Sequence, residues 1–230
     1  MMKSNEKTAI ILGATGLTGS ILLHLLLHHK SYKKVLLFSR SSSGQTHEKL
    51  EEHIIDLQQL QDYKNKFVAN DVFCCIGTTK AKTPNKALYK KIDYGIPVAA
   101  AQLCKENCCN TFIVISALRA NAGSSIFYNK VKGEMEQKVI EQRIAKFHIL
   151  QPSLIAGKRE EKRIGEWIGK QFMTLFNFLF IGDLKKYRSI HAKTIAEAMV
   201  WLANNTYDKV KIESDEIIQL VSDNYGRNRT

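Results

Sequence analysis

The chain has 230 residues, of which 44% are hydrophobic and 24% charged, a composition that excludes disordered and fibrous classes. Lys and Arg number 34 against 22 acidic residues, and the net charge of +12 favours anionic partners without identifying them. Because only three prolines occur and no linker or repeat divides the sequence, we expect residues 1–230 to form one domain.

The first predicted elements are a strand over residues 8–12 and a helix over residues 16–29, joined by a glycine-rich turn. Glycines and hydroxyl side chains interrupt this uncharged stretch, which therefore predicts neither a signal peptide nor a membrane span. A helix that opens on such a turn presents free backbone N–H groups and a positive dipole end to a pyrophosphate. We expect Gly13 to make the turn, Gly16 to admit the ligand and Gly19 to allow close helix packing. The predicted pyrophosphate-binding residues are Gly13, Ala14, Thr15, Gly16, Leu17, Thr18 and Gly19.

Further strands are predicted where short β-branched or aromatic runs are bounded by polar or turn residues. They cover residues 34–38, 53–56, 72–76, 111–115 and 147–150, and an edge strand is predicted over residues 215–220. Helical patterns cover residues 84–107, with Pro84 suited to the helix start and Pro97 expected to bend the helix, and residues 125–142. Apolar strands that alternate with crossover helices predict an α/β fold with a doubly wound, Rossmann-type parallel sheet.

Ligands of such a sheet bind beyond the carboxyl ends of the strands, so residues that follow strands are candidates. Ser39 and Arg40 end the second strand without a carboxylate, which favours the 2′-phosphate of NADP(H) over the free ribose hydroxyl of NAD. The alternative is that Arg40 is an exposed loop residue.

Two other strand ends suit the same dinucleotide. Asp56 and Leu57 follow the third strand, where the Asp56 carboxylate fits either an adenine amino group or the N-cap of a helix. Gly77, Thr78 and Thr79 follow the fourth strand, where a glycine lets the backbone pass close to a ribose.

Tyr128 and Lys132 are four positions apart, which places them on one face of a predicted helix, and Ser116 ends the fifth strand. Carbonyl reduction needs a proton donor for the developing alkoxide. A tyrosine has a free pKa of about 10, and a nearby ammonium lowers that pKa. A serine hydroxyl can hold the carbonyl oxygen. We therefore expect Ser116, Tyr128 and Lys132 to be catalytic, the alternative being a half-buried tyrosine and a solvated lysine.

The order of these features resembles the atypical, extended short-chain dehydrogenase/reductase superfamily. Residues 74–80 (Cys-Cys-Ile-Gly-Thr-Thr-Lys) and 151–154 (Gln-Pro-Ser-Leu), followed by residues 165–167 (Gly-Glu-Trp), resemble the Tat-interacting-protein oxidoreductase family and its bacterial relatives. The resemblance implies a Rossmann-type fold, NADPH binding and a Ser-Tyr-Lys triad at Ser116, Tyr128 and Lys132.

The same resemblance extends the predicted cofactor site. It implies that Pro152, Ser153 and Leu154 lie along the nicotinamide and that Tyr128 and Lys132 also contact the cofactor. Gln151 stands where relatives commonly carry arginine. Two functions are consistent with the family: an NADPH-dependent oxidoreductase that transfers a hydride to a small-molecule carbonyl substrate, or an NADPH-binding regulator or scaffold with protein partners.

Residues 153–195 are predicted to be a small, helical, substrate-side insertion. Large apolar side chains over residues 164–180 favour a helix packed under the C-terminal segments or, alternatively, an apolar wall over the substrate or a partner surface. Two clusters of basic residues occur in the sequence, and without interleaved aromatic residues they favour a solvated surface or a phosphate-bearing small molecule over nucleic acid. The clusters are Lys80, Lys82, Lys86, Lys90 and Lys91, and Lys158, Arg159, Lys162 and Arg163.

Five cysteines occur without a CxxC pair or a matching histidine pattern, so we expect neither a disulfide framework nor a metal site. Cys74 and Cys75 are predicted to be small apolar residues of a buried strand, and Cys104, Cys108 and Cys109 to lie on a helix. This use of cysteine predicts a reducing compartment, and we expect a cytoplasmic location.

Overall fold

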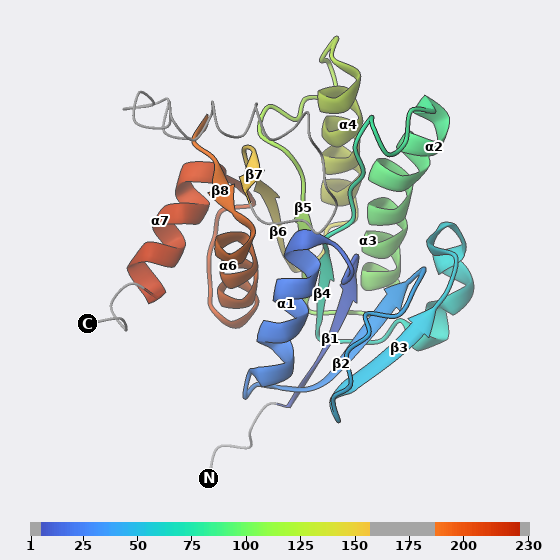
Figure 1. The fold of residues 1–230 in the computed structure, drawn as a ribbon, viewed down its shortest axis with the longest axis vertical. Helices are drawn as coiled ribbons and strands as arrows, with labels where there is room; N and C mark the ends of the chain where they lie inside the picture. Colours follow the sequence, from blue (N-terminus) through green and yellow to red (C-terminus); the bar gives the residue numbers. More distant parts are fainter. Residues whose placement is uncertain (1–5, 157–186, 226–230) are drawn as a thin grey trace.

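The structure, a computed structural model, describes residues 6–156 and 187–225 (Figure 1). In that part of the chain, seven strands form one sheet in the order β3-β2-β1-β4-β5-β6-β9, and every neighbouring pair is parallel. The strands are β1 (Lys7–Leu12), β2 (Tyr32–Ser39), β3 (Leu50–Ile54), β4 (Asp71–Cys74), β5 (Thr111–Ile115), β6 (Lys146–Gln151) and β9 (Lys211–Glu213). This order is that of a doubly wound, Rossmann-type sheet, which confirms the predicted fold class.

Helices cover both faces of the sheet (Figure 1). Helices α1 (Leu17–His28), α6 (Ala192–Asn204) and α7 (Ser214–Tyr225) pack on one face, and η1 (Leu57–Lys66), α3 (Ile96–Glu106) and α4 (Phe127–Glu141) pack on the other. Successive side chains of β1 alternate between the two cores: Ala9 and Ile11 belong to the first, and Ile10 and Leu12 to the second. Because both faces are covered, the central strands β4 and β5 are buried along their whole length, whereas the edge strands β3 and β9 carry charged residues.

The long helix predicted over residues 84–107 is divided into three elements. Helix α2 (Lys86–Lys90) begins after Asn85, whose side chain accepts a hydrogen bond from the Leu88 N–H, and not at Pro84. A π-helical turn, η2 (Lys91–Gly95), then leads into α3. Pro97 has no N–H to donate to the Asp93 carbonyl four residues earlier, and the preceding N–H, that of Ile96, bonds instead to the Lys91 carbonyl.

The C-terminal elements correct one prediction. The edge strand is β9, and residues 215–220 lie inside helix α7. Asp215 and Glu216 occupy the first turn of α7, where acidic side chains favour a helix, and Ile217 and Leu220 are spaced to bury one helical face.

Smaller shifts affect the third strand and the cysteines. The third strand covers Leu50–Ile54 rather than residues 53–56, since it pairs with Val35–Ser39 of β2. Cys104 lies in α3 as expected, whereas Cys108 and Cys109 follow the end of that helix.

Much of the predicted insertion lies outside the described residues. Its two flanks meet in a small parallel pair formed by β7 (Ile155–Ala156) and β8 (Ile190–His191). The apolar segment over residues 164–180 and the basic cluster at Lys158, Arg159, Lys162 and Arg163 fall in the undescribed part. Over the ranges that the structure describes, no helix has the length and apolar character needed to cross a bilayer.

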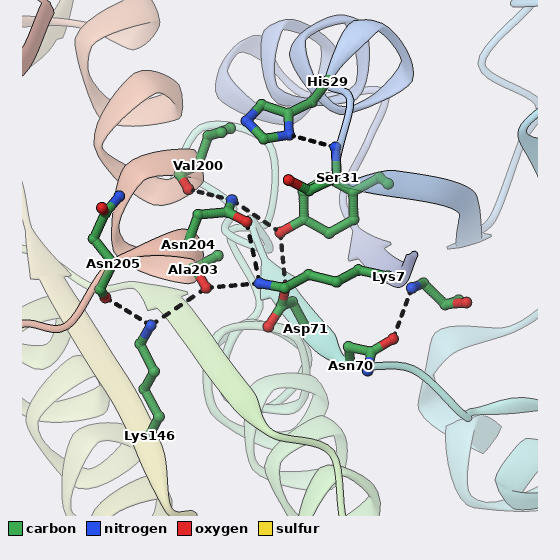
Figure 2. Close-up of polar contacts among 12 residues, drawn as sticks. Lys7, His29, Ser31, Asn70, Asp71, Lys146, Val200, Ala203, Asn204 and Asn205 are labelled. Carbon is green, nitrogen blue, oxygen red and sulfur yellow. Dashed lines mark hydrogen bonds and ion pairs between the residues drawn. The ribbon is translucent and has the colours of Figure 1, made fainter. Parts of the chain in front are cut away.

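Figure 2 shows a partly buried polar cluster where helix α6 ends beside the amino ends of β1, β4 and β6. The Lys7 ammonium lies 3.1 Å from the Asp71 carboxylate and donates to the Ala203 carbonyl at 3.0 Å. The Lys146 ammonium donates to the carbonyl oxygens of Ala203 at 3.3 Å and Asn205 at 2.8 Å. Cations at the negative end of a helix stabilise it, so this cluster holds α6 at the sheet edge opposite the glycine turn.

Candidate functional site

The glycine turn between β1 and α1 is built for close backbone approach. Gly13 has a φ of +84°, and a Cβ on it would lie 2.8 Å from the Cys75 carbonyl oxygen. A Cβ on Gly19 would overlap the Gly13 carbonyl oxygen, so only glycine lets α1 pack this tightly against the turn. Gly16 is the N-cap of α1, and no side chain of the described residues caps it.

The predicted pyrophosphate-binding residues therefore lie together at one turn, which leaves N–H groups of the first helical turn open to a ligand. Thr15 and Gly16 are exposed, Gly13 and Leu17 are half-buried, and Ala14, Thr18 and Gly19 are buried.

Arg40 lies at the same edge of the sheet. Leu12, which precedes the glycine turn, pairs in register with Phe38, and Arg40 follows two residues later. The Arg40 side chain is exposed. Ser39 is buried, and its hydroxyl donates to the Ser41 carbonyl at 2.7 Å, which shapes the chain where β2 ends.

Asp56 and Leu57 follow β3 beside this position. The Asp56 carboxylate accepts a hydrogen bond from the Gln58 N–H at 2.9 Å, so Asp56 is the N-cap of η1. Of the two predicted roles, helix capping and adenine binding, these contacts show capping. Leu57 is buried, so its side chain belongs to the core.

Lys132 forms a buried ion pair that the sequence alone did not reveal. Its ammonium lies 3.0 Å from the Asp93 carboxylate, and the two side chains are 4% and 0% exposed. The second Asp93 oxygen accepts a hydrogen bond from the Thr78 N–H at 2.8 Å. A Cβ on Gly77 would lie 3.7 Å from Asp93 Oδ1 and 3.9 Å from Lys132 Nζ. Thr79 begins the backbone turn that follows. The segment after β4 thus contacts the Lys132–Asp93 pair directly.

Asp93 was missed because an acidic residue in a helical segment is usually solvated. The available signal was its place on an apolar stripe, since Tyr89 and Ile96, four positions before it and three after it, are also buried. The π-helical turn in which Asp93 lies is a distortion that often marks functional sites.

Tyr128 lies one turn before Lys132 on α4 and remains 41% exposed. Desolvation by the surrounding protein raises the pKa of the phenol, Lys132 opposes that rise, and Asp93 adds to it. Burial lowers the pKa of the Lys132 ammonium, but Asp93 and Tyr128 outweigh burial and place this pKa above its ordinary value. In the free chain, therefore, the phenol is protonated and the ammonium charged at neutral pH.

Ser116 is buried at the end of β5 and faces a carboxylate. Its hydroxyl donates to Glu136 Oε1 at 2.5 Å, and the same oxygen accepts from Gln151 Nε2 at 2.8 Å. The other oxygen, Oε2, lies 2.8 Å from the ammonium of Lys211 on β9. Sequence reasoning missed Glu136 and Lys211, although the spacing of Glu136 on α4, four positions after Lys132 and three before the buried Val139, was an available signal.

Residues 152–154 connect neighbouring segments at this edge of the sheet. The Pro152 carbonyl accepts from the Leu118 N–H at 3.0 Å. The Ser153 hydroxyl lies 3.1 Å from the Ser214 hydroxyl and donates to the Arg188 carbonyl. The Leu154 side chain is exposed, and its carbonyl accepts from the Ile190 N–H at 3.0 Å, so these residues are tied to β8 and α7.

The candidate residues form two groups beyond the carboxyl ends of the strands. The glycine turn and Arg40 lie at β1 and β2, whereas Lys132 with Asp93, and Ser116 with Glu136, lie at β4, β5 and β6. The Cys75 carbonyl beside Gly13 connects the two groups. Within the described ranges, no cluster of three or more His, Cys, Asp or Glu side chains has the arrangement of a metal site.

The first basic cluster is partly neutralised. The Lys90 ammonium lies 2.6 Å from the Glu134 carboxylate of α4 and 5.3 Å from the centre of the Tyr94 ring. Lys86 lies 5.5 Å from the centre of the Phe127 ring. Part of this positive charge therefore serves contacts within the chain.

Comparison with known proteins supports a nicotinamide-binding fold. Residues 8–101 match the family described as Semialdehyde dehydrogenase, NAD binding domain. UDP-glucose 4-epimerase of Thermotoga maritima, solved with UDP-glucose, is similar in structure with a TM-score of 0.68 at 14% identity, over 97% of this chain and 84% of that one. The Bordetella bronchiseptica enzyme WbmH, solved with NAD+, has a TM-score of 0.68 at 14% identity, over 93% and 78% of the two chains. At such low identity these structures establish the fold alone.

Sequence relatives are closer. Protein HTATIP2 of Rattus norvegicus is 32% identical over 174 residues, which are 74% of this chain and 72% of that protein. Protein FMP52-1, mitochondrial, of Scheffersomyces stipitis is 32% identical over 183 residues, 77% of this chain and 76% of that protein. Protein FMP52, mitochondrial, of Eremothecium gossypii is 28% identical over 228 residues, 93% and 96% of the two chains.

These relatives correct one expectation. The fungal FMP52 proteins are mitochondrial, which contradicts the cytoplasmic location inferred from cysteine usage. A reduced cysteine set does not distinguish between reducing compartments, and this is why the inference failed. The extent and identity of the matches, together with the glycine turn and parallel sheet, show that the chain belongs to the HTATIP2 and FMP52 family of atypical short-chain dehydrogenases/reductases, with an NAD(P)-binding Rossmann fold.

Proposed function

We propose that the chain is an NADP(H)-dependent oxidoreductase that reduces a small-molecule carbonyl substrate, with Tyr128 as the general acid. The observation that carries this proposal is the buried Lys132–Asp93 pair, one helical turn from Tyr128 and in contact with the segment that leaves β4. Burying two charges costs more solvation than their attraction usually returns, so such a pair is a poor device for stability. Beyond the carboxyl ends of the strands, where ligands of such sheets bind, a buried pair of this kind supports a catalytic role.

The glycine turn fits a dinucleotide because a Cβ on Gly13 would meet the Cys75 carbonyl and because the N-terminus of α1 opens at Gly16. Residues 13–19 would hold the pyrophosphate. The exposed Arg40 beyond β2 would pair with a 2′-phosphate, which favours NADP(H) over NAD. When bound, the dinucleotide supplies the hydride.

Each side chain then has a defined part. Tyr128, protonated in the free chain, gives its phenolic proton to the alkoxide oxygen that develops as the carbonyl carbon is reduced. The Lys132 ammonium stabilises the phenolate left behind. Asp93 does not reach the substrate in this scheme, and its carboxylate keeps Lys132 charged despite burial.

The test is replacement of Tyr128 by phenylalanine, with a panel of carbonyl compounds screened for NADPH oxidation. We expect turnover to fall by about 100-fold or more, because positioned proton transfer contributes that much, and NADPH affinity to stay nearly unchanged. Tyr63→Phe is the matched control, since Tyr63 lies on η1, which packs against α3, and is not among the candidate site residues. Loss of NADPH binding in Tyr128→Phe would make Tyr128 structural. Tight NADPH binding by the wild type without turnover on any carbonyl would favour the regulatory role instead.

A further inference from the structure

Glu136 lies on α4 at the centre of a buried hydrogen-bond network that joins four elements. The residue is 1% exposed. One carboxylate oxygen accepts from Ser116 Oγ at 2.5 Å and from Gln151 Nε2 at 2.8 Å, and the other lies 2.8 Å from Lys211 Nζ. Glu136 therefore faces three donors, which come from the end of β5, from β6 and from β9.

The chemistry of these donors sets the direction of the hydrogen bonds. The Lys211 ammonium can only donate hydrogen bonds. The Gln151 amide presents its N–H group to Glu136, because the flipped amide would place its own oxygen against a carboxylate oxygen. Glu136 forms an ion pair with the Lys211 ammonium at 2.8 Å, and its other carboxylate oxygen accepts from Ser116 and Gln151. An ionised carboxylate can only accept. The single hydroxyl proton of Ser116 is consequently committed to Glu136.

We propose that Glu136, held by Lys211, fixes the polarity of Ser116, so that Ser116 can only accept a hydrogen bond on the side that faces the reacting group. A carbonyl oxygen offers lone pairs and cannot donate to such a serine, whereas the hydroxyl of the alcohol can. Ser116 thus binds the alcohol form of the substrate, and Tyr128 alone donates to the carbonyl. For its catalytic part this inference rests on the proposed function; the direction of the Ser116 proton does not. Glu136 and Lys211 are positioning residues.

Lys211 brings a partly exposed positive charge to the buried network. It lies on the edge strand β9, in register with Ile149 of β6, and its side chain is 45% exposed. The positive charge that neutralises Glu136 therefore reaches it from the sheet edge, while Gln151 of β6 contributes a neutral amide. Because Lys211 is partly solvated, removing the Glu136 charge does not strand a buried cation, and variants at position 136 are expected to fold.

Replacing Glu136 by glutamine should reverse the polarity of Ser116. Lys211 has no acceptor, so the new amide oxygen turns toward it and the amide NH2 group turns toward Ser116 and Gln151, whose own amide rotates to present its oxygen. Ser116 then accepts that hydrogen bond, and its own proton becomes free for the crevice. With a carbonyl compound found by NADPH oxidation and its corresponding alcohol, we expect Glu136→Gln to lower the KM of the carbonyl and raise that of the alcohol, each by about tenfold. A common change of both KM values in the same direction would overturn the proposal.

A second measurement does not need turnover. A short O–H···O⁻ bond deshields its proton, so we expect a hydroxyl proton resonance downfield of the amide region in the wild-type NMR spectrum. The resonance should vanish in Ser116→Ala and Glu136→Gln and persist in Glu141→Gln, a matched change at an exposed position of the same helix. Its absence from the wild type, or its survival in Ser116→Ala, would refute the inference. Its presence in a protein that turns over no carbonyl would refute the proposed function alone.

Discussion

Replacing Asp93 by asparagine removes the carboxylate that pairs with Lys132 while keeping the side-chain volume and an acceptor for the Thr78 N–H. At the observed separation of 3.0 Å, and with an effective dielectric constant of about 20, two unit charges attract by about 5 kcal/mol. Asparagine leaves the Lys132 ammonium buried without that attraction. Breaking buried pairs in this way costs about 3–5 kcal/mol, and we expect the free energy of unfolding to fall by that amount at neutral pH.

The pH dependence of this loss has a definite sign. Burial lowers the pKa of Lys132, and in the wild type Asp93 outweighs burial and raises it. The wild-type contribution is therefore complete below the unfolded pKa of about 10.4 and is lost only as the pH rises through the folded value. In Asp93→Asn burial prevails and the folded pKa lies below the unfolded one, so the deficit is largest at neutral pH. It should shrink between pH 7 and pH 9.5, by up to about 1.4 kcal/mol per unit.

Urea unfolding of the wild type, Asp93→Asn, Lys132→Met and the double variant measures the coupling. We expect the free energy of unfolding of the double variant to exceed, by at least about 2 kcal/mol, the value obtained by adding the losses of the two single variants. The reason is that methionine removes the ammonium that Asp93→Asn leaves unpaired. The exposed Lys138–Glu141 pair, at 2.7 Å, is the control and should couple by less than about 1 kcal/mol. The reasoning would be refuted if the Lys132–Asp93 pair coupled no more strongly than this control. It would also be refuted if the stability deficit of Asp93→Asn grew as the pH rises.

Three further changes test other parts of the structure. Arg40→Ala should weaken NADPH binding in calorimetry and leave NADH binding nearly unchanged, and equal losses would contradict the 2′-phosphate assignment. Gly19→Ala should lower both the unfolding midpoint and dinucleotide affinity, because the new Cβ would overlap the Gly13 carbonyl; unchanged affinity would show that the turn relaxes. Burial and, less strongly, Lys146 lower the pKa of His148, so wild-type stability should fall as the pH drops below about 6.5 through the folded value. In urea titrations at pH 7.5 and 5.5, His148→Gln should lose less unfolding free energy between the two pH values than the wild type. An equal loss in both proteins would contradict the assignment of this pH dependence to His148.

The sequence by itself was sufficient wherever the meaning of a residue depends on its immediate neighbours. The glycine turn was recognisable because one strand, three spaced glycines and one helix follow each other directly, and the structure has those elements. Tyr128 and Lys132 were placed on one helical face by their spacing alone. In α7, by contrast, six residues were too few for periodicity to separate strand from helix, and the acidic first turn carried the missing information.

Only the tertiary structure decided what surrounds these residues. Asp93 reaches Lys132 from a π-helical turn that depends on Pro97, and Lys211 reaches Glu136 from an edge strand about 75 positions away in the chain. No local pattern encodes such pairs, because the energy of a buried charge is set by whichever segments the folded sheet brings beside it. The chain order thus identified the candidate groups, and the packing of distant segments determined which charges and hydrogen-bond partners surround them.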